Sequence, residues 1–465
     1  MTAALTVVPT TTAARPHPCP ALPFPDAEDT SMFQLNRSRR RTDCDGTNRR
    51  DFLKIGALGA TGLTLPTLLQ ARAKAAASGS PSKNTSVVWL WLGGGPTHIE
   101  TFDPKMSAPP EYRSVTGAVK THLPGVELGG NFEKMAKLAD KMAFVRSFAH
   151  RNSGHGGGTH WVMTGYDFAA ADNGAPANKP GIGSIVSRYR GPNNPHTGLP
   201  TYVRMGGTLG DGPAWLGAPY APFDVQGKAR SNMTLAVAAD RLDDRKGLLR
   251  TFDTADRQLD ASGLMAGMDG FEQQAFELIL SRAKDVFDVK REDPRVRDKY
   301  GPGLGEQLMM ARRLCEAGVG FVTVHFGGWD MHGGIKDAMN NLGPKVDRAV
   351  AAFVEDCNDR GLDQDVLLVV TGEFGRTPRV NGGAGRDHWA PLSTLALAGG
   401  GLRMGQVVGE SNAKAEMPKT TPITPQDLMA TVFHTLGLPP DLQYKDPTGR
   451  PTSMIVAGKP IAELV

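Results

Sequence analysis

The stretch that most constrains this chain is a buried-strand pattern that breaks into a charged loop. Residues 366–370 are five apolar residues in a row, VLLVV. A run like this, bounded by polar and glycine positions, predicts a strand covered on both faces. The loop after it, up to Pro391, carries Glu373, Arg376, Arg379, Arg386, Asp387 and His388. Because ligands of open α/β sheets lie just past the carboxyl ends of the strands, we expect the functional site there.

Strand patterns alternate with helix patterns along the rest of the chain. Strands are predicted at residues 86–92, 143–148, 201–204, 320–326 and 393–398. Helices are predicted at residues 132–141, the second half of 150–165, 181–189, 270–288, 305–317, 344–359 and 425–436, the last with Thr424 as N-cap. This alternation predicts a three-layer α/β/α sandwich with a mainly parallel central sheet. Residues 205–265 are irregular and Gly/Pro-rich, which indicates an insertion over the top of the sheet.

The N-terminal 77 residues predict an export leader. Residues 1–48 show no apolar period, and we expect a disordered lead. Arg49 and Arg50 then precede a Gly-rich apolar stretch at 55–69 and a small-residue cleavage site at 75–77, an order typical of a twin-arginine signal. A transmembrane anchor is the alternative. The apolar stretch has 15 residues, three of them glycine, whereas a membrane-spanning helix needs about 20 apolar residues. The mature domain is then residues 78–465, in the periplasm or secreted, and Met32 is an alternative start to Met1.

The charge balance of the mature part excludes two classes of partner. The leader holds ten of the 52 Lys and Arg residues and six of the 48 Asp and Glu residues, which leaves 42 of each. We therefore expect neither nucleic acid nor a membrane surface as a partner. Only Cys315 and Cys357 remain after the leader, either as a disulfide in an oxidising compartment or as small core residues.

Histidines and carboxylates concentrate where the predicted strands end. The loops at residues 93–103, 149–160, 327–334 and 372–388 and the strand end before the third of them hold His98, Asp103, His150, His155, His160, His325, Asp330, His332, Glu373, Asp387 and His388. Right-handed crossovers would bring these loops to one edge of the sheet. Imidazoles with carboxylates are the ligand set of Zn²⁺ and similar ions, so a divalent metal, zinc or calcium, is expected. The glycine runs match neither a P-loop nor a dinucleotide fingerprint.

Three of these sites each have a specific functional interpretation, and the first two also have a structural one. Asp330 and His332 follow two glycines at i and i+2, so both can point to one side as ligands, or Asp330 can cap a turn. Glu373 sits directly past its strand, as a ligand or general base, or as the salt-bridge partner of Arg376. His388 follows Asp387, so that one can ligate while the other orients it.

Two further features suggest anion chemistry. The three arginines of the late loop could clamp a tetrahedral oxyanion or could be solvated. His155 lies in a run of glycines before a predicted helix, whose N-terminus favours anions and activated nucleophiles. The structural alternative is a flexible glycine turn.

Taken in order, these motifs resemble a known family. The twin-arginine leader is followed by LGGGPTHIETFDPK, HRNSGHGGGTHWVMTG, GGWDMHGG, TGEFGRTP, GRDHW and DPTGRP. Over about residues 48–465 the chain resembles the DUF1501 proteins, which are exported and often labelled sulfatase-like. The resemblance implies an alkaline phosphatase-like α/β/α fold, shared with sulfatases and phosphatases, with metal at the strand ends.

The chain departs from that superfamily's pattern at three places. The resemblance aligns Asp330, His332 and His388 with metal ligands, but Phe374 stands where a histidine is expected after Glu373. Gly93-Gly94-Gly95 replaces the aspartates expected after the first strand, and the candidate substitutes for those aspartates are His98 and Asp103. His155 occupies the nucleophile position that a sulfatase fills with Cys or Ser.

We therefore expect an exported, metal-dependent hydrolase of phosphate or sulfate esters with a non-standard nucleophile. Its substrate is expected to be a small-molecule or polysaccharide ester. The candidate metal ligands are Asp330, His332, Glu373, Asp387, His388 and His98, and the candidate catalytic residues are His155, His160 and Arg376. The alternative is a catalytically degenerate periplasmic binding or assembly protein on the same fold, acting with a protein partner, which the missing nucleophile and aspartates favour.

Overall fold

The structure is a computed structural model that describes residues 85–226 and 282–465. The predicted leader at 1–77, residues 227–265 of the predicted insertion and residues 270–281 of a predicted helix lie outside the described residues. The described start of the predicted insertion holds two short 3₁₀ helices, Ala214–Leu216 and Ala218–Tyr220, and a two-residue strand.

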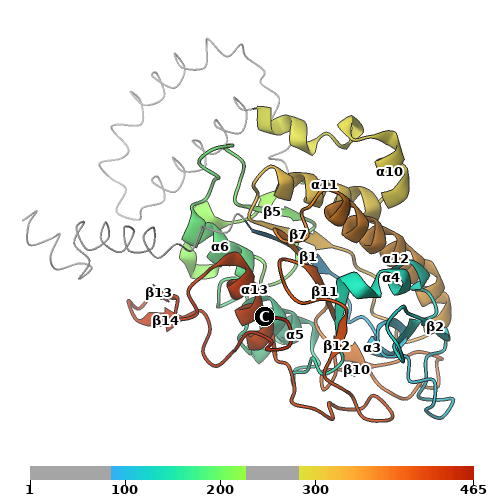
Figure 1. The fold of residues 1–465 in the computed structure, drawn as a ribbon. Helices are drawn as coiled ribbons and strands as arrows, with labels where there is room; N and C mark the ends of the chain where they lie inside the picture. The colour runs from blue at the N-terminus through green and yellow to red at the C-terminus, as the bar shows by residue number, and fades with distance from the viewer. Residues whose placement is uncertain (1–84, 227–281) are drawn as a thin grey trace, which may run out of the picture. The chain divides into compact units, whose positions relative to one another are not determined.

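An eight-stranded sheet forms the middle layer of the fold (Figure 1). Its strands, in spatial order, are β12 (Gln406–Val408), β4 (Met142–Val145), β11 (Leu395–Gly399), β8 (Val366–Thr371), β1 (Ser86–Trp91), β7 (Phe321–His325), β5 (Tyr202–Met205) and β6 (Phe223–Asp224). Only β11 runs antiparallel to its neighbours, so the predicted mainly parallel sheet is confirmed.

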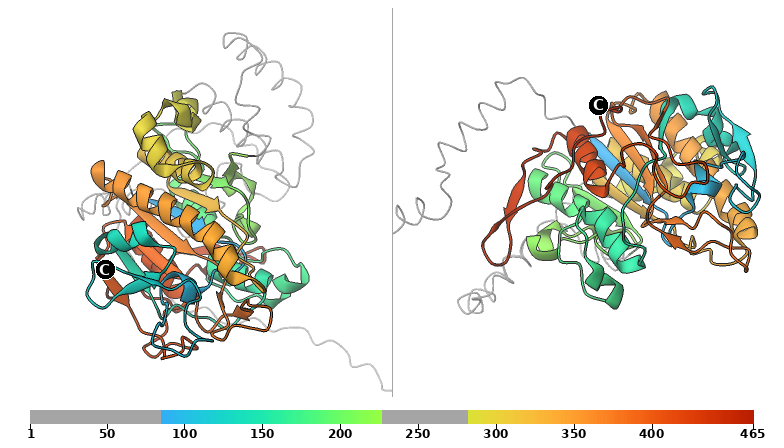
Figure 2. Two further views of the ribbon diagram at one scale, coloured as in Figure 1. Left: turned by 90° about the vertical axis from the view of Figure 1, so that its right-hand side faces the viewer. Right: turned by 90° about the horizontal axis from the view of Figure 1, so that it is seen from below.

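Side chains of the central strand alternate between two cores. Val88, Leu90 and Leu92 enter the core under α4 (Glu133–Lys137), α11 (Leu304–Glu316) and α12 (Ile335–Asp359). Val87, Trp89 and Trp91 enter the core under α5 (His155–Thr164), α6 (Ile182–Arg190) and α13 (Pro425–Leu436). Because successive strand residues point to opposite faces, a continuous apolar run buries both faces of β1. Helices therefore cover both sides of the sheet, which is the predicted α/β/α sandwich (Figure 2).

The structure corrects some predicted element bounds. The helix expected to begin at Pro344 begins nine residues earlier, at Ile335, and Pro344 lies inside it. A proline removes one helical hydrogen bond, but Ile335 and Met339 before it are buried in the same core as Val346, so packing carries the helix through. The strand predicted at 143–148 ends at Val145, and residues 282–287 form a 3₁₀ helix. Thr424 caps α13 in a capping box, as its sequence position indicates.

The register of the central strands sets the position of the site. Trp91 pairs with both His325 and Thr371, so β1, β7 and β8 end level with one another. β4 runs in the same direction as β8, because both are antiparallel to β11 between them. A two-stranded ribbon, β9 (Gly375–Arg376) with β10 (His388–Trp389), then folds the late loop back and sets His388 opposite Arg376. Loops after four strands thus meet at one edge.

None of the helices in residues 85–226 and 282–465 has the length and apolar character that crossing a membrane requires.

Candidate metal centre

Three imidazoles converge on one carboxylate at this edge of the sheet. Oδ1 of Asp330 lies 3.0 Å from Nε2 of His332 and 3.1 Å from Nε2 of His388. Its other oxygen, Oδ2, lies 3.3 Å from Nε2 of His155. The four residues come from the loop after β7, the start of α5 and β10, and we call them the histidine–aspartate centre. Asp330, His155 and His388 offer ligand atoms that all lie within 4.8 Å of one another.

The far nitrogen of each imidazole is held by an oxygen that can only accept. Nδ1 of His155 lies 2.9 Å from Oε1 of Glu373, and Nδ1 of His332 lies 2.6 Å from Oδ1 of Asp387. Nδ1 of His388 lies 2.9 Å from the carbonyl oxygen of Ser153. Each Nδ1 therefore carries the proton, and each Nε2 turns a lone pair toward Asp330. Metal-binding histidines are oriented in this way by carboxylates and carbonyls behind them.

Two features of the centre fit a bound divalent cation. Nε2 of His332 and Nε2 of His388 are 3.1 Å apart, and two facing lone pairs at that distance require a proton or a cation between them. Oε2 of Glu373 is buried and has no hydrogen-bond partner. Nitrogen–oxygen sets like this one suit Zn²⁺, whose tetrahedral ligands lie about 3.3 Å apart, whereas Ca²⁺ takes six to eight oxygens. The residues present therefore fit zinc or a similar ion better than calcium.

The electrostatics of the centre keep the Asp330 carboxylate charged. Burial alone would raise the pKa of Asp330, but the hydrogen bond from Arg376 and the charge of Arg376 outweigh it and hold the pKa well below its usual range. The hydrogen bond to Glu373 raises the pKa of His155 against the opposing effect of burial, whereas burial lowers the pKa of His388. About half of each of the Asp330, His332 and His155 side chains is exposed, so the centre is open to solvent.

The glycines after β1 make room for this arrangement. The backbone N–H of Gly94 donates to Oε1 of Glu373 at 2.8 Å. A Cβ on Gly94 would lie 2.5 Å from the backbone nitrogen of Asp330, and one on Gly95 would lie 2.3 Å from the ring of Phe374. Both glycines also have positive φ angles, 117° and 79°. Glycine is therefore required at Gly94 and Gly95, because the backbone there packs directly against Asp330 and Phe374 and leaves no room for a side chain.

Phe374 forms an apolar wall beside two of the imidazoles. It is fully buried, and its ring centroid lies 4.3 Å from that of His388 and 5.2 Å from that of His155. It offers no ligand atom, so the centre is asymmetric: ligands on the His332 side, an aromatic face on the other.

Comparison with known proteins decides the family. The family model described as "Protein of unknown function (DUF1501)" matches residues 84–465. The chain belongs to the DUF1501 family. No curated protein matches it.

Solved structures resemble this DUF1501 protein only distantly. A lipoteichoic acid synthase, LtaP, from Listeria monocytogenes is 10% identical and covers 82% of this chain and 76% of its own, with a TM-score of 0.34. The PsFucS1 sulfatase from Pseudoalteromonas sp. is 13% identical over 80% and 70%, with a TM-score of 0.35. The phosphonate monoester hydrolase SpPMH from Silicibacter pomeroyi is 13% identical over 77% and 74%, with a TM-score of 0.28. TM-scores this low leave the function to be decided by the chain's own residues.

Two of the three arginines of the late loop, Arg376 and Arg386, are buried and bound by other groups of the protein, so they do not form a free oxyanion clamp. The Arg376 side chain is fully buried, with Nε 2.8 Å from the Gly95 carbonyl oxygen, Nη1 bound to the Arg386 carbonyl, and Nη2 bound to the Gly94 carbonyl and to Asp330. Arg376 thus orients Asp330, which differs from its predicted contact with an oxyanion. It pairs with Asp330 and not with Glu373, the alternative drawn from the sequence. Arg386 is buried 3.1 Å from Glu100.

The N-terminus of α5 is occupied by a side chain of the same DUF1501 domain. Oδ1 of Asp172 accepts a hydrogen bond from the backbone N–H of Gly157 at 2.7 Å. A Cβ on Gly154, Gly156 or Gly157 would approach Asp172, Ala171 or Asn152 to within about 2.2 Å. These glycines therefore serve close packing, and the helix end that was expected to attract an anion already holds a carboxylate.

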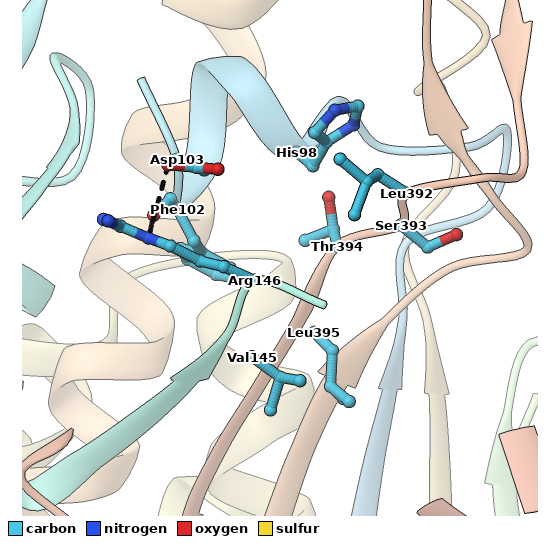
Figure 3. A pocket seen from close by; sticks show the side chains of 9 residues that line it. All are labelled: His98, Phe102, Asp103, Val145, Arg146, Leu392, Ser393, Thr394 and Leu395. Atoms are coloured by element: carbon cyan, nitrogen blue, oxygen red, sulfur yellow. Dashed lines mark hydrogen bonds and ion pairs between the residues drawn. The ribbon is translucent and has the colours of Figure 1, made fainter. Parts of the chain in front are cut away.

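His98 and His160 are the two predicted site residues that the structure does not bring to the centre. His98 is buried with Nε2 3.1 Å from the Ala415 carbonyl, and burial lowers its pKa to about 4. It lines a cavity of about 10 Å³ with Asp103, which pairs with Arg146 at 3.5 Å (Figure 3). His160 is fully buried on α5, with Nδ1 2.8 Å from the Tyr166 carbonyl.

Sequence reasoning missed Ser153, which holds the centre, and placed His150 among the strand-end histidines without a role. The Ser153 carbonyl orients His388, and His150 binds the backbone of Glu373. Neither contact has a signal in the sequence, because each uses a backbone carbonyl from another loop. Cys315 and Cys357 are both free and buried. Of the two alternatives drawn from the sequence, a disulfide or two core residues, the structure shows the second.

Proposed function

We propose that this DUF1501 protein is a metal-dependent hydrolase of phosphate or sulfate esters. The observation that carries the proposal is the convergence of three Nε2 atoms on Asp330, with all three Nδ1 atoms held from behind. Asp330, His332 and His388 would hold a divalent ion, for which zinc fits best. When bound, such an ion would act as a Lewis acid toward an ester oxygen.

His155 is the proposed nucleophile or general base. Its Nδ1–H is donated to Glu373, so Nε2 is free to accept a proton or to attack. The same hydrogen bond raises the pKa of His155, which makes its Nε2 more basic. Glu373 then stabilises the imidazolium that forms, and Phe374 shields that side of the imidazole from water.

The test combines metal analysis with a substrate screen. Mature protein purified without chelators should contain about one equivalent of a transition-metal ion. It should hydrolyse at least one of the p-nitrophenyl esters of phosphate, methyl phosphate and sulfate. Glu373→Gln should abolish turnover, because it removes the negative charge that holds the Nδ1–H of His155. Protein that is folded but holds no stoichiometric metal would sink the proposal.

A binding or assembly protein on the same fold is the second candidate. It is favoured by one observation: Arg376 and the α5 N-terminus, the two groups suited to an oxyanion, are engaged with Asp330 and Asp172. Under this alternative, Glu373→Gln would weaken capture of a periplasmic protein partner, and neither the variant nor the wild type would turn over an ester.

Export through the twin-arginine route is part of the same proposal. The leader carries Arg49 and Arg50 directly before Asp51-Phe52-Leu53. A reporter fused to residues 1–77 should reach the periplasm, and changing both arginines to lysine should hold it in the cytoplasm. Export of the lysine variant would contradict the assignment.

A further inference from the structure

We propose that His150 is a positioning residue that fixes Glu373, and through it the catalytic imidazole of His155. The inference rests on the proposed function, because it assigns His150 a role in the site that His155 and Glu373 form. His150 follows β4 and touches none of the atoms assigned to the ester or the metal.

The contact that carries the inference joins two strand-end loops. Nε2 of His150 lies 2.6 Å from the backbone carbonyl oxygen of Glu373. A carbonyl only accepts, so His150 donates through Nε2–H. Its Nδ1 accepts from the backbone N–H of Asn152 at 3.3 Å, which fixes the tautomer.

His150 holds Glu373 from one side while Gly94 holds it from the other. The backbone carbonyl of Glu373 is fixed by His150, and its carboxylate is fixed by the Gly94 N–H at 2.8 Å. The same carboxylate receives Nδ1–H of His155. Because both ends of Glu373 are anchored, its carboxylate has one position from which to orient His155.

His150 also binds the residue that directly follows β10, the strand that carries His388. Its backbone N–H donates to the carbonyl of Ala390 at 3.1 Å, and its ring packs on Trp161 with centroids 5.4 Å apart. Burial lowers the pKa of His150 to about 4, so the imidazole stays neutral, and its single Nε2–H remains a donor, across physiological pH. His150 thus connects the loop after β4 with Glu373 in the loop after β8 and with the residue that follows β10.

The test separates the hydrogen bond from the packing with two variants of nearly equal size. His150→Gln keeps a donor on a flexible chain, and His150→Met removes it. With the ester that wild type turns over, His150→Met should lose at least tenfold in kcat, with KM and metal content unchanged, because small misplacements of a catalytic group cost about a hundredfold. His150→Gln should stay within about threefold of wild type. His434→Leu, at an exposed position on α13, is the matched control.

A readout independent of turnover distinguishes failure of this inference from failure of the proposed function. The Nδ1–H of His155, bonded to a carboxylate, should give a downfield proton NMR resonance that His155→Gln abolishes. It should persist in His150→Gln and shift or disappear in His150→Met. If the wild-type protein hydrolyses no ester, the proposed function fails, and this resonance alone tests whether His150 positions Glu373 and His155. If His150→Met does not fold, His150→Phe, which keeps a ring against Trp161 without the donor, takes its place. An unchanged resonance in the folded donor-less variant overturns the inference.

Discussion

Asp387 shows how much of this site depends on residues behind the imidazoles. Its Oδ1 receives Nδ1–H of His332 at 2.6 Å, and both carboxylate oxygens lie 3.3 Å from the side-chain amide of Asn381. The hydrogen bond from His332 lowers the pKa of Asp387, so the carboxylate is charged at neutral pH. Asp387 is therefore better described as the group that orients a ligand than as the ligand, one of the two roles its sequence position allowed.

Asp387→Ala should weaken metal binding without unfolding the protein. Removing a carboxylate behind a metal-bound histidine typically costs 10- to 100-fold in affinity. Its side chain is half exposed, so the free energy of unfolding of the metal-free protein should change by less than about 0.5 kcal/mol. Chelator competition and urea denaturation measure the two quantities. Asp359→Ala, at an exposed position ending α12, is the control and should change neither. Unchanged affinity in Asp387→Ala would contradict the assigned role.

At the scale of elements, the glycine turn after β1 connects the fold to the site. It ends the central strand and lets Asp330 and Phe374 approach its backbone. The GHGGG segment at the start of α5 does the same for the turn that carries Asp172. Glycine runs that read as flexible in the sequence are, in the structure, sites of close contact.

Gly95→Ala should be more destabilising than an alanine at a glycine with a similar backbone angle. Gly95 and Gly174 have φ angles of 79° and 81°, but a Cβ at Gly174 meets nothing within 4 Å, whereas one at Gly95 meets the Phe374 ring. Both variants should lose about 1–2 kcal/mol from the left-handed conformation. Overpacking should cost Gly95→Ala a further ~1–3 kcal/mol, with weaker metal binding. Urea midpoints of the two variants give the comparison, and equal losses would refute it.

At the scale of the whole molecule, the proposed ligands come from distant segments of the chain. Asp330 and His332 lie in one loop, His388 lies in another, and the imidazole beside them, His155, lies in a third segment. A bound ion would therefore join segments that only the folded sheet brings together, so metal binding and folding stability should be linked.

Removal of the metal should lower the melting temperature. A ligand that binds only the folded state at a thousandfold excess over its Kd stabilises by about 4 kcal/mol. Excess chelator should therefore shift thermal unfolding downward, and added Zn²⁺ should restore it. Excess chelator should leave the melting temperature of the His388→Ala variant almost unchanged. A chelator shift of equal size in that variant would place the stabilising metal elsewhere.

A buried ion network away from the centre makes stability depend on pH. Glu292 contacts Arg312, Arg313 and Arg360, which join the segment before α10 (Pro294–Tyr300) to α11 and α12. Burial alone would raise the pKa of Glu292, but these hydrogen bonds and charges outweigh it and lower the pKa to about 2 from 4.5. A carboxylate with a depressed folded-state pKa stabilises above its unfolded pKa and loses that contribution as pH falls toward the folded value.

Stability should therefore fall between about pH 4.5 and pH 2, by at most about 3 kcal/mol from this residue. In Glu292→Gln the free energy of unfolding should already be lower at pH 6 and should fall less on acidification. Urea denaturation at pH 6 and pH 3 measures the difference. An identical acid response in the variant and wild type would exclude Glu292 as its source.

The sequence by itself determined the architecture and the edge on which the site lies. Continuous apolar runs such as that of β8 can only be buried on both faces, and the alternation of strands with amphipathic helices leaves few topologies. The types of residue at the strand ends then predicted imidazole and carboxylate chemistry there, including Asp330, His332, Glu373 and His388, because those positions follow directly from where strands stop.

Only the tertiary structure decided which of these residues meet and what each one does. His98 and His160 share the strand-end pattern, but their side chains point into the protein interior. There, a ring nitrogen of each is hydrogen-bonded to a backbone carbonyl, that of Ala415 or Tyr166. Arg376 belongs to a polar loop in the sequence, but in the structure its side chain is buried and forms an ion pair with Asp330. The contacts that separate these outcomes span up to several hundred residues and often end on backbone carbonyls. Such acceptors are the same for every residue type, so no sequence pattern marks them.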